Sequence, residues 1–224
     1  MRRLKLALGI GVLCLPLTVP VVHAQGESAA IQKLRREATA GDASARFNLG
    51  RSYFIGDGVP RNSNQAVLWW KKAAEQGHAD GQFNLGVMYA IGNGVPKNAA
   101  QAVFWYRKAA EQGNASGQFS LGHAYNKGDV VPKDSSQAVF WYRKAAEQGN
   151  ASAQNNLGNA YYKGEGVPRD LVLSYMWRNL AAATQGNQYA ATYAREARDA
   201  MVVLMTPAQV AEAQKLSSEW KPKK

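Results

Sequence analysis

The fifteen residues 102–116, AVFWYRKAAEQGNAS, recur without a single change at residues 138–152. The two copies lie 36 residues apart, and the same period continues in both directions along the chain. Three markers keep it over four units: a proline at 60, 96, 132 and 168, a tryptophan at 69, 105, 141 and 177, and a glycine at 56, 92, 128 and 164. A fixed period of this length indicates a repeat architecture, in which each unit packs against its neighbours.

Each unit is expected to fold as two short helices. In the first unit a helix over about 43–55 is followed by Gly-Asp-Gly-Val-Pro, where Gly56 suits a C-cap with positive φ and Pro60 cannot continue a helix. A second helix is expected from about Ser63 to just before Gly77. Its N-terminus carries a capping-box pattern, which recurs as Asn62/Gln65, Asn98/Gln101 and Asp134/Gln137. Since Val130 replaces the second loop glycine in the third unit, that position is not expected to need positive φ.

The apolar positions of each unit predict a core between the helices. Helices of about a dozen residues are marginal alone in water, so each must bury one face against its neighbours. Leu49, Tyr53, Ala66 and Trp69 and their equivalents at 36-residue spacing supply that face. The glycines at 50, 86, 122 and 158 would allow the helices to approach closely. Packing is the favoured role of the tryptophan stripe, and stacking on a sugar or another ligand is the alternative.

The two ends of the repeat array depart from the pattern, as terminal repeats usually do. A single helix is expected over about 27–40, and two more over about 187–205 and 207–220, the last opening with a capping box at Thr206 and Gln209. An apolar stripe of Val210, Ala213, Leu216 and Trp220 would cover the open end, and residues 221–224 are expected to fray. The predicted organisation is a signal peptide (1–24), an N-terminal capping helix (25–39), four repeats (40–75, 76–111, 112–147, 148–183) and C-terminal capping helices with a basic tail (184–224).

The first segment has the layout of a secretory signal peptide. Arg2, Arg3 and Lys5 precede an uncharged run that ends in Val22-His23-Ala24, a small-residue site for cleavage after Ala24. The run is shorter than the roughly 20 apolar residues of a membrane span, so an uncleaved anchor is the weaker alternative. Cleavage removes Cys14 and leaves 200 residues with 24 basic and 16 acidic side chains, a formal net charge of +8. We therefore expect a cysteine-free periplasmic or secreted protein, with nucleic acid excluded as its partner.

The repeated motifs carry a family resemblance. The Leu-Gly-x-x-Tyr tetrad in a helix-turn-helix unit resembles the tetratricopeptide repeat, whose period is 34 residues. The 36-residue period, the Gly-x-Gly-Val-Pro linker and the Ala-x-x-Trp start of the second helix are similar to the related Sel-one-like repeat (SLR) family over residues 40–183. The resemblance implies an all-α fold, a right-handed α/α solenoid with a concave groove, and a role as an adaptor or regulator. Exported relatives include immunity proteins against secreted toxins, partners of sensor kinases, and cysteine-rich proteins linked to β-lactam binding.

A catalytic or metal site is not expected from the residues present. After the signal peptide only two histidines remain, and neither has a second histidine at ligand spacing. His78 occupies the N-cap position that Asp42, Asn114 and Asn150 hold in the other units, which predicts a capping role. Ser-x-x-Lys and Lys-Thr-Gly motifs are absent from the sequence, which argues against serine β-lactamase chemistry. We therefore predict a protein that is not an enzyme and uses no cofactor.

One face of the first helix of each unit varies from copy to copy while the core markers hardly change. Positions at 4-3-4 spacing share this face. It reads Ser44, Asn48, Arg51, Ile55; Asp80, Asn84, Val87, Ile91; Ser116, Ser120, His123, Lys127; and Ser152, Asn156, Asn159, Lys163. If these helices line the concave side, as in the family, this face is the candidate partner groove, and its asparagines could bind a peptide backbone. The alternative is an ordinary solvated face whose asparagines bond within their own repeat.

The second helix of each unit carries pairs of bases. They are Lys71 and Lys72, Arg107 and Lys108, and Arg143 and Lys144, with Glu75, Glu111 and Glu147 four residues after the first base of each pair. Such charge runs are usually solvated surfaces. The alternative is attachment to an anionic glycan, lipid headgroups or an acidic protein.

The residues favour a non-enzymatic periplasmic or secreted module whose groove binds another exported protein. Immunity to a secreted toxin and regulation of an envelope receptor stay open within that class. A structural protein that docks on peptidoglycan or anionic lipid through its net charge is the alternative from another class. A protein that binds or hydrolyses β-lactams is a third possibility, and no nucleophile in the sequence supports it.

Overall fold

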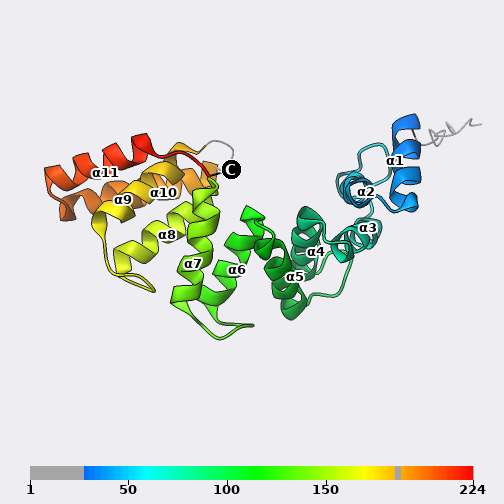
Figure 1. Ribbon diagram of the computed structural model, residues 1–224, viewed down its shortest axis with the longest axis horizontal. Coiled ribbons are helices and arrows are strands. Elements are labelled where there is room, and N and C mark those ends of the chain that lie inside the picture. The colour runs from blue at the N-terminus through cyan, green and yellow to red at the C-terminus, as the bar shows by residue number, and fades with distance from the viewer. Residues whose placement is uncertain (1–27, 185–187, 224) are drawn as a thin grey trace, which may run out of the picture.

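The computed structural model describes residues 28–184 and 188–223, which contain eleven α-helices, one 3-10 turn and no β-strand. The elements are α1 (Ala29–Ala40), α2 (Ala43–Ile55), α3 (Ser63–Glu75), α4 (Ala79–Ile91), α5 (Ala99–Glu111), α6 (Ala115–Lys127), α7 (Ser135–Glu147), α8 (Ala151–Lys163), α9 (Leu171–Ala183), α10 (Gln188–Met201), η1 (Val202–Leu204) and α11 (Pro207–Glu219). They follow one another in a curved row, with α1 at one end and α11 at the other (Figure 1). The predicted signal peptide, residues 1–24, lies outside the described residues. None of the described helices is long and apolar enough to span a membrane.

The predicted all-α solenoid of two-helix units is confirmed. The first helices of the units (α2, α4, α6, α8) end at glycines with φ between 74° and 83°, as expected for Gly56 and its equivalents. The second helices α3, α5 and α7 begin where the side chains of Asn62, Asn98 and Asp134 accept the backbone N–H of the glutamine three residues later. Among the described helices, the reciprocal bond that completes a capping box is present at α11, between Gln209 and the N–H of Thr206. The three other expected boxes are therefore single caps.

The second loop glycine corrects the prediction made from Val130. Gly58, Gly94 and Gly166 all have positive φ, between 69° and 75°. A Cβ on Gly94 would lie 2.5 Å from the carbonyl oxygen of Ser63, at the start of the preceding second helix. The loop therefore needs glycine where it crosses that helix. Val130 has a negative φ. The prediction therefore holds for the third unit and is wrong for the three units that have glycine at this position.

The core lies between the helices of each unit and between neighbouring units. The leucine of each tetrad is completely buried, at positions 49, 85, 121 and 157. The glycine that follows it lies against the next helix: a Cβ on Gly50, Gly86, Gly122 or Gly158 would come within 3.0 Å of the side chain at 70, 106, 142 or 178. Trp69 and Trp177 are buried, and Trp105 and Trp141 are half-buried, so the tryptophan stripe packs as predicted.

A row of buried glutamines, which the sequence analysis did not identify, connects the units. Gln82, Gln118 and Gln154 are at most 5% exposed, and each donates from Nε2 to a backbone carbonyl at the end of the preceding helix. Gln112 donates to Gln82, and Gln148 donates to Gln118. Buried polar groups need such partners, because leaving one unpaired costs about 1–3 kcal/mol. The glutamines therefore fix the stacking of one unit on the next.

The C-terminal helices differ in two details from their prediction. The helix expected over 187–205 ends at Met201 and continues as the 3-10 turn η1, while residues 185–187 lie outside the described residues. On α11 Leu216 is exposed, and Ser217 is buried in its place, accepting a hydrogen bond from Asn179. The stripe of four apolar residues is therefore interrupted where α11 packs on α9.

The tail predicted to fray is attached to the solenoid up to Lys223. The backbone N–H of Lys223 donates to the carbonyl oxygen of Glu147 at 2.8 Å, and its Nζ lies 2.9 Å from the Glu147 carboxylate. Trp220 packs edge-on against Trp177, with ring centroids 6.2 Å apart. These contacts return the end of the chain to the third unit. The expectation of a free tail is wrong for the described residues, because sequence spacing does not show contacts across 76 positions.

Candidate protein-binding groove

The variable face of α2, α4, α6 and α8 is open to solvent, as the groove prediction requires. Its most exposed members are Ser44, Asn48, Arg51, Ile55, Asp80, Ile91, His123, Lys127 and Lys163. The remaining members, Asn84, Val87, Ser116, Ser120, Ser152, Asn156 and Asn159, are half-buried. We call this set of sixteen positions the groove face. Its side chains point away from the buried leucines at 49, 85, 121 and 157 because they lie on the other side of the same helices.

Three hollows lie between successive first helices in the part of the chain that the structure describes. Hollow I, between α2 and α4, has about 120 Å³ and is lined by Arg51, Phe54, Trp70, Asn84, Val87 and Met88. Hollow II, between α4 and α6, has about 280 Å³ and is lined by Ala90, Lys97, Ala99, Ala102, Val103, Tyr106, Ser120, His123, Ala124, Lys127, Asp129 and Val130. Hollow III, between α6 and α8, has about 210 Å³ and is lined by His123, Asn126, Ser135, Ala138, Val139, Tyr142, Asn156, Asn159, Ala160 and Glu165. The groove face is therefore a row of hollows.

The structure brings most predicted groove residues to these hollows. Arg51, Asn84 and Val87 line hollow I, Ser120 and Lys127 line hollow II, Asn156 and Asn159 line hollow III, and His123 lines both II and III. Asn48 lines a separate depression of about 190 Å³ on α2, beside Arg51 and Asp57. Ser44 and Lys163 line none of these hollows. Asp80 also lies outside them and accepts a hydrogen bond of 2.7 Å from Asn114, the N-cap of α6.

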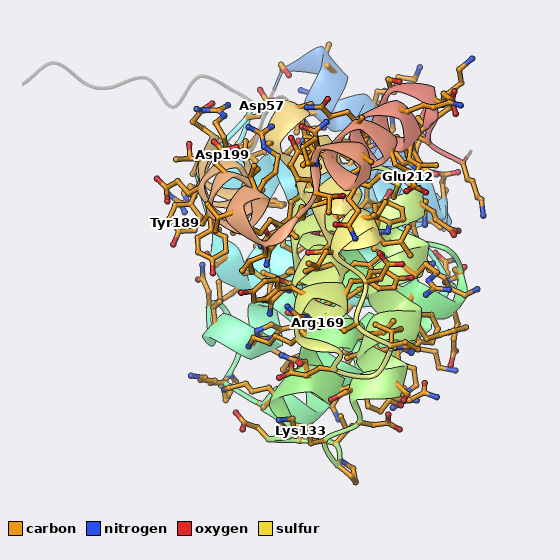
Figure 2. All side chains as sticks on the ribbon, turned by 90° about the vertical axis from the view of Figure 1, so that its left-hand side faces the viewer. Asp57, Lys133, Arg169, Tyr189, Asp199 and Glu212 are labelled. Carbon is orange, nitrogen blue, oxygen red and sulfur yellow. The ribbon has the colours of Figure 1, made fainter. Side chains whose placement is uncertain are left out.

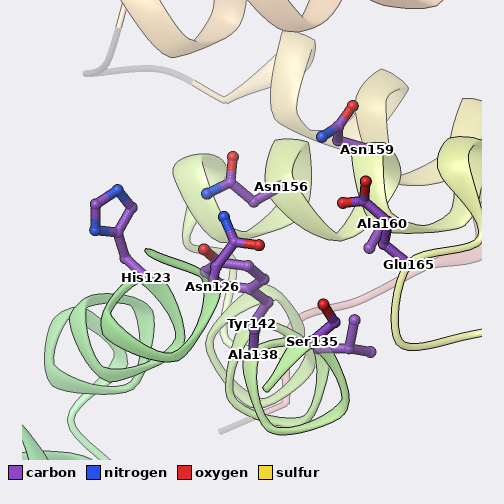
Figure 3. Close-up of a pocket in the computed structure, with 10 residues that line it drawn as sticks. His123, Asn126, Ser135, Ala138, Tyr142, Asn156, Asn159, Ala160 and Glu165 are labelled. Atoms are coloured by element: carbon purple, nitrogen blue, oxygen red, sulfur yellow. The ribbon is translucent and has the colours of Figure 1, made fainter. Parts of the chain in front are cut away.

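Hollow III is the most polar of the three. In the close-up of Figure 3, His123 and Asn126 of α6 face Asn156 and Asn159 of α8 across the opening, with Tyr142 of α7 between them. Tyr142 is 3% exposed, and its hydroxyl has no hydrogen-bond partner among the described residues. Burial raises the pKa of Tyr142 to about 12, and the nearby Asn156 side chain opposes part of this rise without meeting the geometry of a hydrogen bond.

Acidic and basic side chains pair at the rims of the hollows. Lys127 forms an ion pair with Asp129 beside hollow II, and Lys163 lies 3.9 Å from Glu165 beside hollow III. All four side chains are at least half exposed, so water and salt weaken both pairs. The groove is therefore electrically mixed and has no strong preference for an anionic or a cationic partner.

The pairs of bases on the second helices divide into two groups with different contacts. Arg107 and Arg143 lie over the rings of Tyr125 and Tyr161 on the following helix, and Arg143 also donates to the Tyr161 hydroxyl at 2.8 Å. Lys71 pairs with Glu75 at 3.9 Å.

The other group lies beside aromatic rings of its own helices, of which Phe104 and Phe140 are exposed and Trp69 is buried. Lys72 lies 4.4 Å from the Trp69 ring centroid, Lys108 lies 6.0 Å from that of Phe104, and Lys144 lies 5.1 Å from that of Phe140. We call Lys72, Lys108, Lys144, Phe104 and Phe140 the lysine-aromatic face. The six bases of the predicted stripe therefore have different contacts, and three of them belong to the lysine-aromatic face.

The histidine at the start of α4 has a structural role. His78 caps α4, as predicted: its Nδ1 accepts the N–H of Gly81 at 3.2 Å, and its ring stacks on Phe47 at 4.7 Å. Within residues 28–184 and 188–223 no group of three or more His, Cys, Asp or Glu side chains could hold a metal ion.

The C-terminal end adds an exposed surface that the sequence analysis missed. Tyr189 of α10 is 85% exposed and Val203 of η1 is 86% exposed. Figure 2 looks onto this end and shows Tyr189 and Asp199 of α10 on one side and Glu212 of α11 on the other.

Comparison with known proteins agrees with the fold. The family model described as Sel1 repeat matches residues 43–78, 79–114, 115–150 and 151–183. Each matched unit begins at the first residue of a first helix, three residues after the start of the predicted unit. No curated protein matches the chain.

Two solved structures resemble this chain over a larger share of its length than the family model does. A Sel1 repeat protein from Oxalobacter formigenes is 37% identical with a TM-score of 0.67, over 75% of this chain and 48% of that one. The protective antigen c5321 of uropathogenic Escherichia coli, which displays an SLR fold, is 29% identical with a TM-score of 0.52, over 87% of this chain and 56% of that one. The present chain thus spans about half the length of these two proteins.

The family model covers more than half of the chain, and the period, the two-helix units and the solved structures agree with it. Sel1 repeats are typically non-enzymatic modules for protein–protein interaction, and the row of hollows provides a surface of that kind. The chain belongs to the Sel1 repeat family.

Proposed function

We propose that this protein is exported and, without catalysing a reaction, binds another exported protein in the groove formed by hollows I, II and III. The observation that carries the proposal is the contrast between a core repeated almost unchanged and a row of hollows whose lining changes at every junction. A solenoid presents its partner with one extended surface, and its selectivity comes from the residues that differ between repeats. Immunity to a secreted toxin and regulation of an envelope receptor are the two roles that fit this activity.

Export is supported by the sequence of residues 1–24. A basic start, a short apolar run and a small residue before the cleavage site suit a secretory signal. The rest of the chain, residues 25–224, carries no cysteine, so it needs no reducing compartment. Its formal net charge is +8. N-terminal sequencing of protein recovered from the periplasm tests this part of the proposal, with Gln25 expected as the first residue. A retained Met1 would contradict it.

The main experiment is affinity purification of the tagged protein from native envelope extract, followed by mass spectrometry. The groove variant carries Arg51→Glu, Val87→Glu and His123→Glu, which place a charge in each hollow. The matched control carries three glutamates on the lysine-aromatic face: Lys72→Glu, Lys108→Glu and Lys144→Glu. All six positions are exposed or half-buried, so both variants should unfold at temperatures close to that of the unmodified protein.

One exported protein in stoichiometric amount, lost by the groove variant and kept by the control, is the expected result. Its identity then chooses between the two roles, because a toxin indicates immunity and a sensor indicates regulation. Binding that survives in the groove variant would contradict the groove assignment.

A second candidate function, attachment to an anionic lipid surface, is favoured by the lysine-aromatic face. Phe104 and Phe140 are 47% and 48% exposed, and each lies beside a lysine of its own helix. Exposed aromatic rings next to bases suit the boundary between lipid headgroups and acyl chains. Sedimentation with phosphatidylcholine vesicles, with and without phosphatidylglycerol, tests it at low and high salt. Binding that needs phosphatidylglycerol, weakens with salt and disappears in the three-lysine control variant would support this function; equal binding by that variant would exclude it.

A further inference from the structure

Two positions of each repeat unit meet at the floor of the groove. The first lies on the first helix of the unit and is occupied in turn by Phe54, Ala90, Asn126 and Tyr162. The second lies on the second helix and is occupied by Trp70, Tyr106, Tyr142 and Arg178. Each pair keeps the 36-residue period, so the four floors can be compared directly. We call them the floor pairs.

The floor pairs at the two ends of the array fill their own space. Phe54 packs on Trp70 with ring centroids 5.3 Å apart, and the Trp70 Nε1 donates to the carbonyl oxygen of Phe47. Arg178 lies 5.2 Å from the ring centroid of Tyr162 and donates to the carbonyl oxygen of Ala197. A large side chain at the first position therefore closes the floor, and hollow I keeps only about 120 Å³.

The two central floor pairs leave their space open. Ala90 and Asn126 are smaller than Phe54 and Tyr162 at the same position, and hollows II and III have about 280 and 210 Å³. Four alanines, at positions 90, 99, 102 and 124, make much of the wall of hollow II apolar. Carboxamides of Asn126, Asn156 and Asn159 make hollow III polar. His123 lines both, so the two hollows are neighbours with opposite character.

The hydrogen-bonding capacity of hollow III is not fully used. The Tyr142 hydroxyl is buried without a partner, and at the same position Trp70 donates from Nε1 to a backbone carbonyl, while Arg178 donates from Nη1 to another and leaves its Nε unpaired. Each asparagine carboxamide can both donate and accept. In Figure 3 the carboxamides of Asn126 and Asn156 lie above the Tyr142 ring, so they can pass hydrogen bonds between a ligand and the hydroxyl.

The charges around hollow III favour an uncharged ligand group. No lysine or arginine is among the residues that line it, so an anion would lose its hydration without gaining an opposite charge. Its one carboxylate, Glu165, already has Lys163 at 3.9 Å, which opposes a second cation. A neutral group with both a donor and an acceptor matches the asparagines and avoids both costs.

The neighbouring hollow distinguishes a peptide from a sugar chain. The alanine wall of hollow II offers no hydrogen-bond partner to the hydroxyl groups that a glycan presents along its length. An extended peptide can present an apolar side chain to hollow II and a polar one to hollow III.

We propose that hollow III is a specificity pocket for the carboxamide side chain of an asparagine or glutamine in an extended segment of the partner, whose neighbouring apolar side chain occupies hollow II. This assignment rests on the proposed function, since it names what the groove recognises.

The test uses a positional library of acetylated, amidated nonapeptides and measures their binding to the purified protein by fluorescence polarisation. Enrichment of Asn or Gln at one position, with an apolar residue selected nearby, is expected. Tyr142→Phe should weaken the selected peptide about fivefold, the effect of one lost hydrogen bond, without lowering the unfolding temperature, because the hydroxyl it removes is unpaired. Selection of Asp, Glu, Lys or Arg instead, or no selection at that position, would overturn the assignment, as would binding of N-acetylglucosamine oligomers with no peptide selected.

Two filling variants serve as matched controls. Asn126→Phe copies the floor of the first unit, where Phe54 packs on Trp70, and should remove the Asn and Gln preference. Ala90→Phe should remove only the preference for an apolar neighbour. If Asn126→Phe leaves both the peptide preference and partner capture unchanged while the groove variant loses the partner, the pocket assignment fails and the proposed function stands. If peptides are selected as expected but no protein is captured from the envelope, the proposed function fails and the pocket stands.

Discussion

Helices α5 and α7 share eleven consecutive residues, 101–111 and 137–147, yet their tyrosines have different surroundings. Tyr106 is half-buried at the edge of the larger, more apolar hollow II. Tyr142 is 3% exposed under the asparagines of hollow III. The identical arginines also differ, because Arg143 donates to the hydroxyl of Tyr161 whereas Arg107 lies over the ring of Tyr125 at 5.7 Å.

The difference shows where the selectivity of this solenoid resides. Identical local sequence gives the same helix, with the same glutamine at the C-cap and the same buried alanines. The residues that surround it come from the first helices on either side, and these vary between units. The second helices therefore act as a constant support, and the first helices give each junction its character.

The largest difference is expected when a methyl group is added beneath each tyrosine. A Cβ at Gly122 would lie 2.8 Å from the Tyr142 ring and 3.1 Å from the Ala138 carbonyl oxygen, and Gly86 has nearly the same contacts with Tyr106 and Ala102. Overpacking costs up to about 3 kcal/mol, and alanine returns about 1 kcal/mol of helix propensity. We therefore expect Gly122→Ala to lower the free energy of unfolding by about 2 kcal/mol.

Gly86→Ala, the matched control, should cost about 1 kcal/mol, because the half-buried Tyr106 can move into hollow II. Urea unfolding of both variants measures the difference. Equal losses would show that the two tyrosines are held equally tightly.

High pH should affect Tyr142 more than Tyr106. Burial raises the pKa of both phenols to about 12, from 10 in an unfolded chain. A raised pKa means that the fold favours the neutral phenol, so the stability it contributes is complete below pH 10 and is lost as the pH rises towards 12. We expect a loss of about 2 kcal/mol from Tyr142 and less from the more exposed Tyr106.

Unfolding free energies between pH 9 and about 12, measured for the unmodified protein, Tyr142→Phe and Tyr106→Phe, test this difference. The Tyr142→Phe curve should be the flattest of the three. A curve for Tyr142→Phe that follows the unmodified protein would show that Tyr142 ionises freely.

Replacing the two arginines should separate a hydrogen bond from a ring contact. Arg143→Met removes the 2.8 Å bond to Tyr161 together with a cation–π contact, for an expected loss of about 1–1.5 kcal/mol. Arg107→Met removes the contact with the ring of Tyr125, with an expected loss of about 0.5 kcal/mol. Thermal unfolding at matched pH and salt compares them, and the reverse order would contradict the assigned contacts.

The smallest effect is expected at the attached tail, which reaches α7 but not α5. Lys223→Ala removes the ion pair with Glu147, whose lysine side chain is 71% exposed, so the loss should not exceed about 0.5 kcal/mol. The backbone bond from Lys223 to Glu147 and the packing of Trp220 on Trp177 stay in place. Deleting residues 220–224 should cost several times more, and equal losses would show that the ion pair alone holds the tail.

Much of the fold could be predicted because its signals are local and repeated. The glycine caps, the prolines and the buried leucines each act within a few residues, and four copies averaged out the exceptions. Inside the repeats the errors concern the second loop glycine and the three single caps, and the other errors fall where the pattern stops: at η1, at the exposed Leu216 and at the tail bound to Glu147. The buried glutamines were missed because a polar residue on a helix gives no sequence signal that distinguishes a bond between units from contact with water.

The candidate site was predicted less completely. The 4-3-4 spacing placed His123, Asn156 and Asn159 on one face of their helices, and they line the hollows. It could not show that Asp80 bonds to Asn114, or that Asn126 and Tyr142 form the floor between them. Those contacts join helices from different units, and their distances depend on how the units stack.

The sequence by itself determined the two-helix unit, the period and the family, because caps, turns and apolar spacing act over neighbouring residues. Only the tertiary structure decided which junctions are filled and which are open. The volume left at the floor depends on the pair of side chains that two different helices bring together, Phe54 on Trp70 at one junction and Asn126 beside Tyr142 at another. Space between packed helices is a property of the pair, so no single helix in the sequence reveals it.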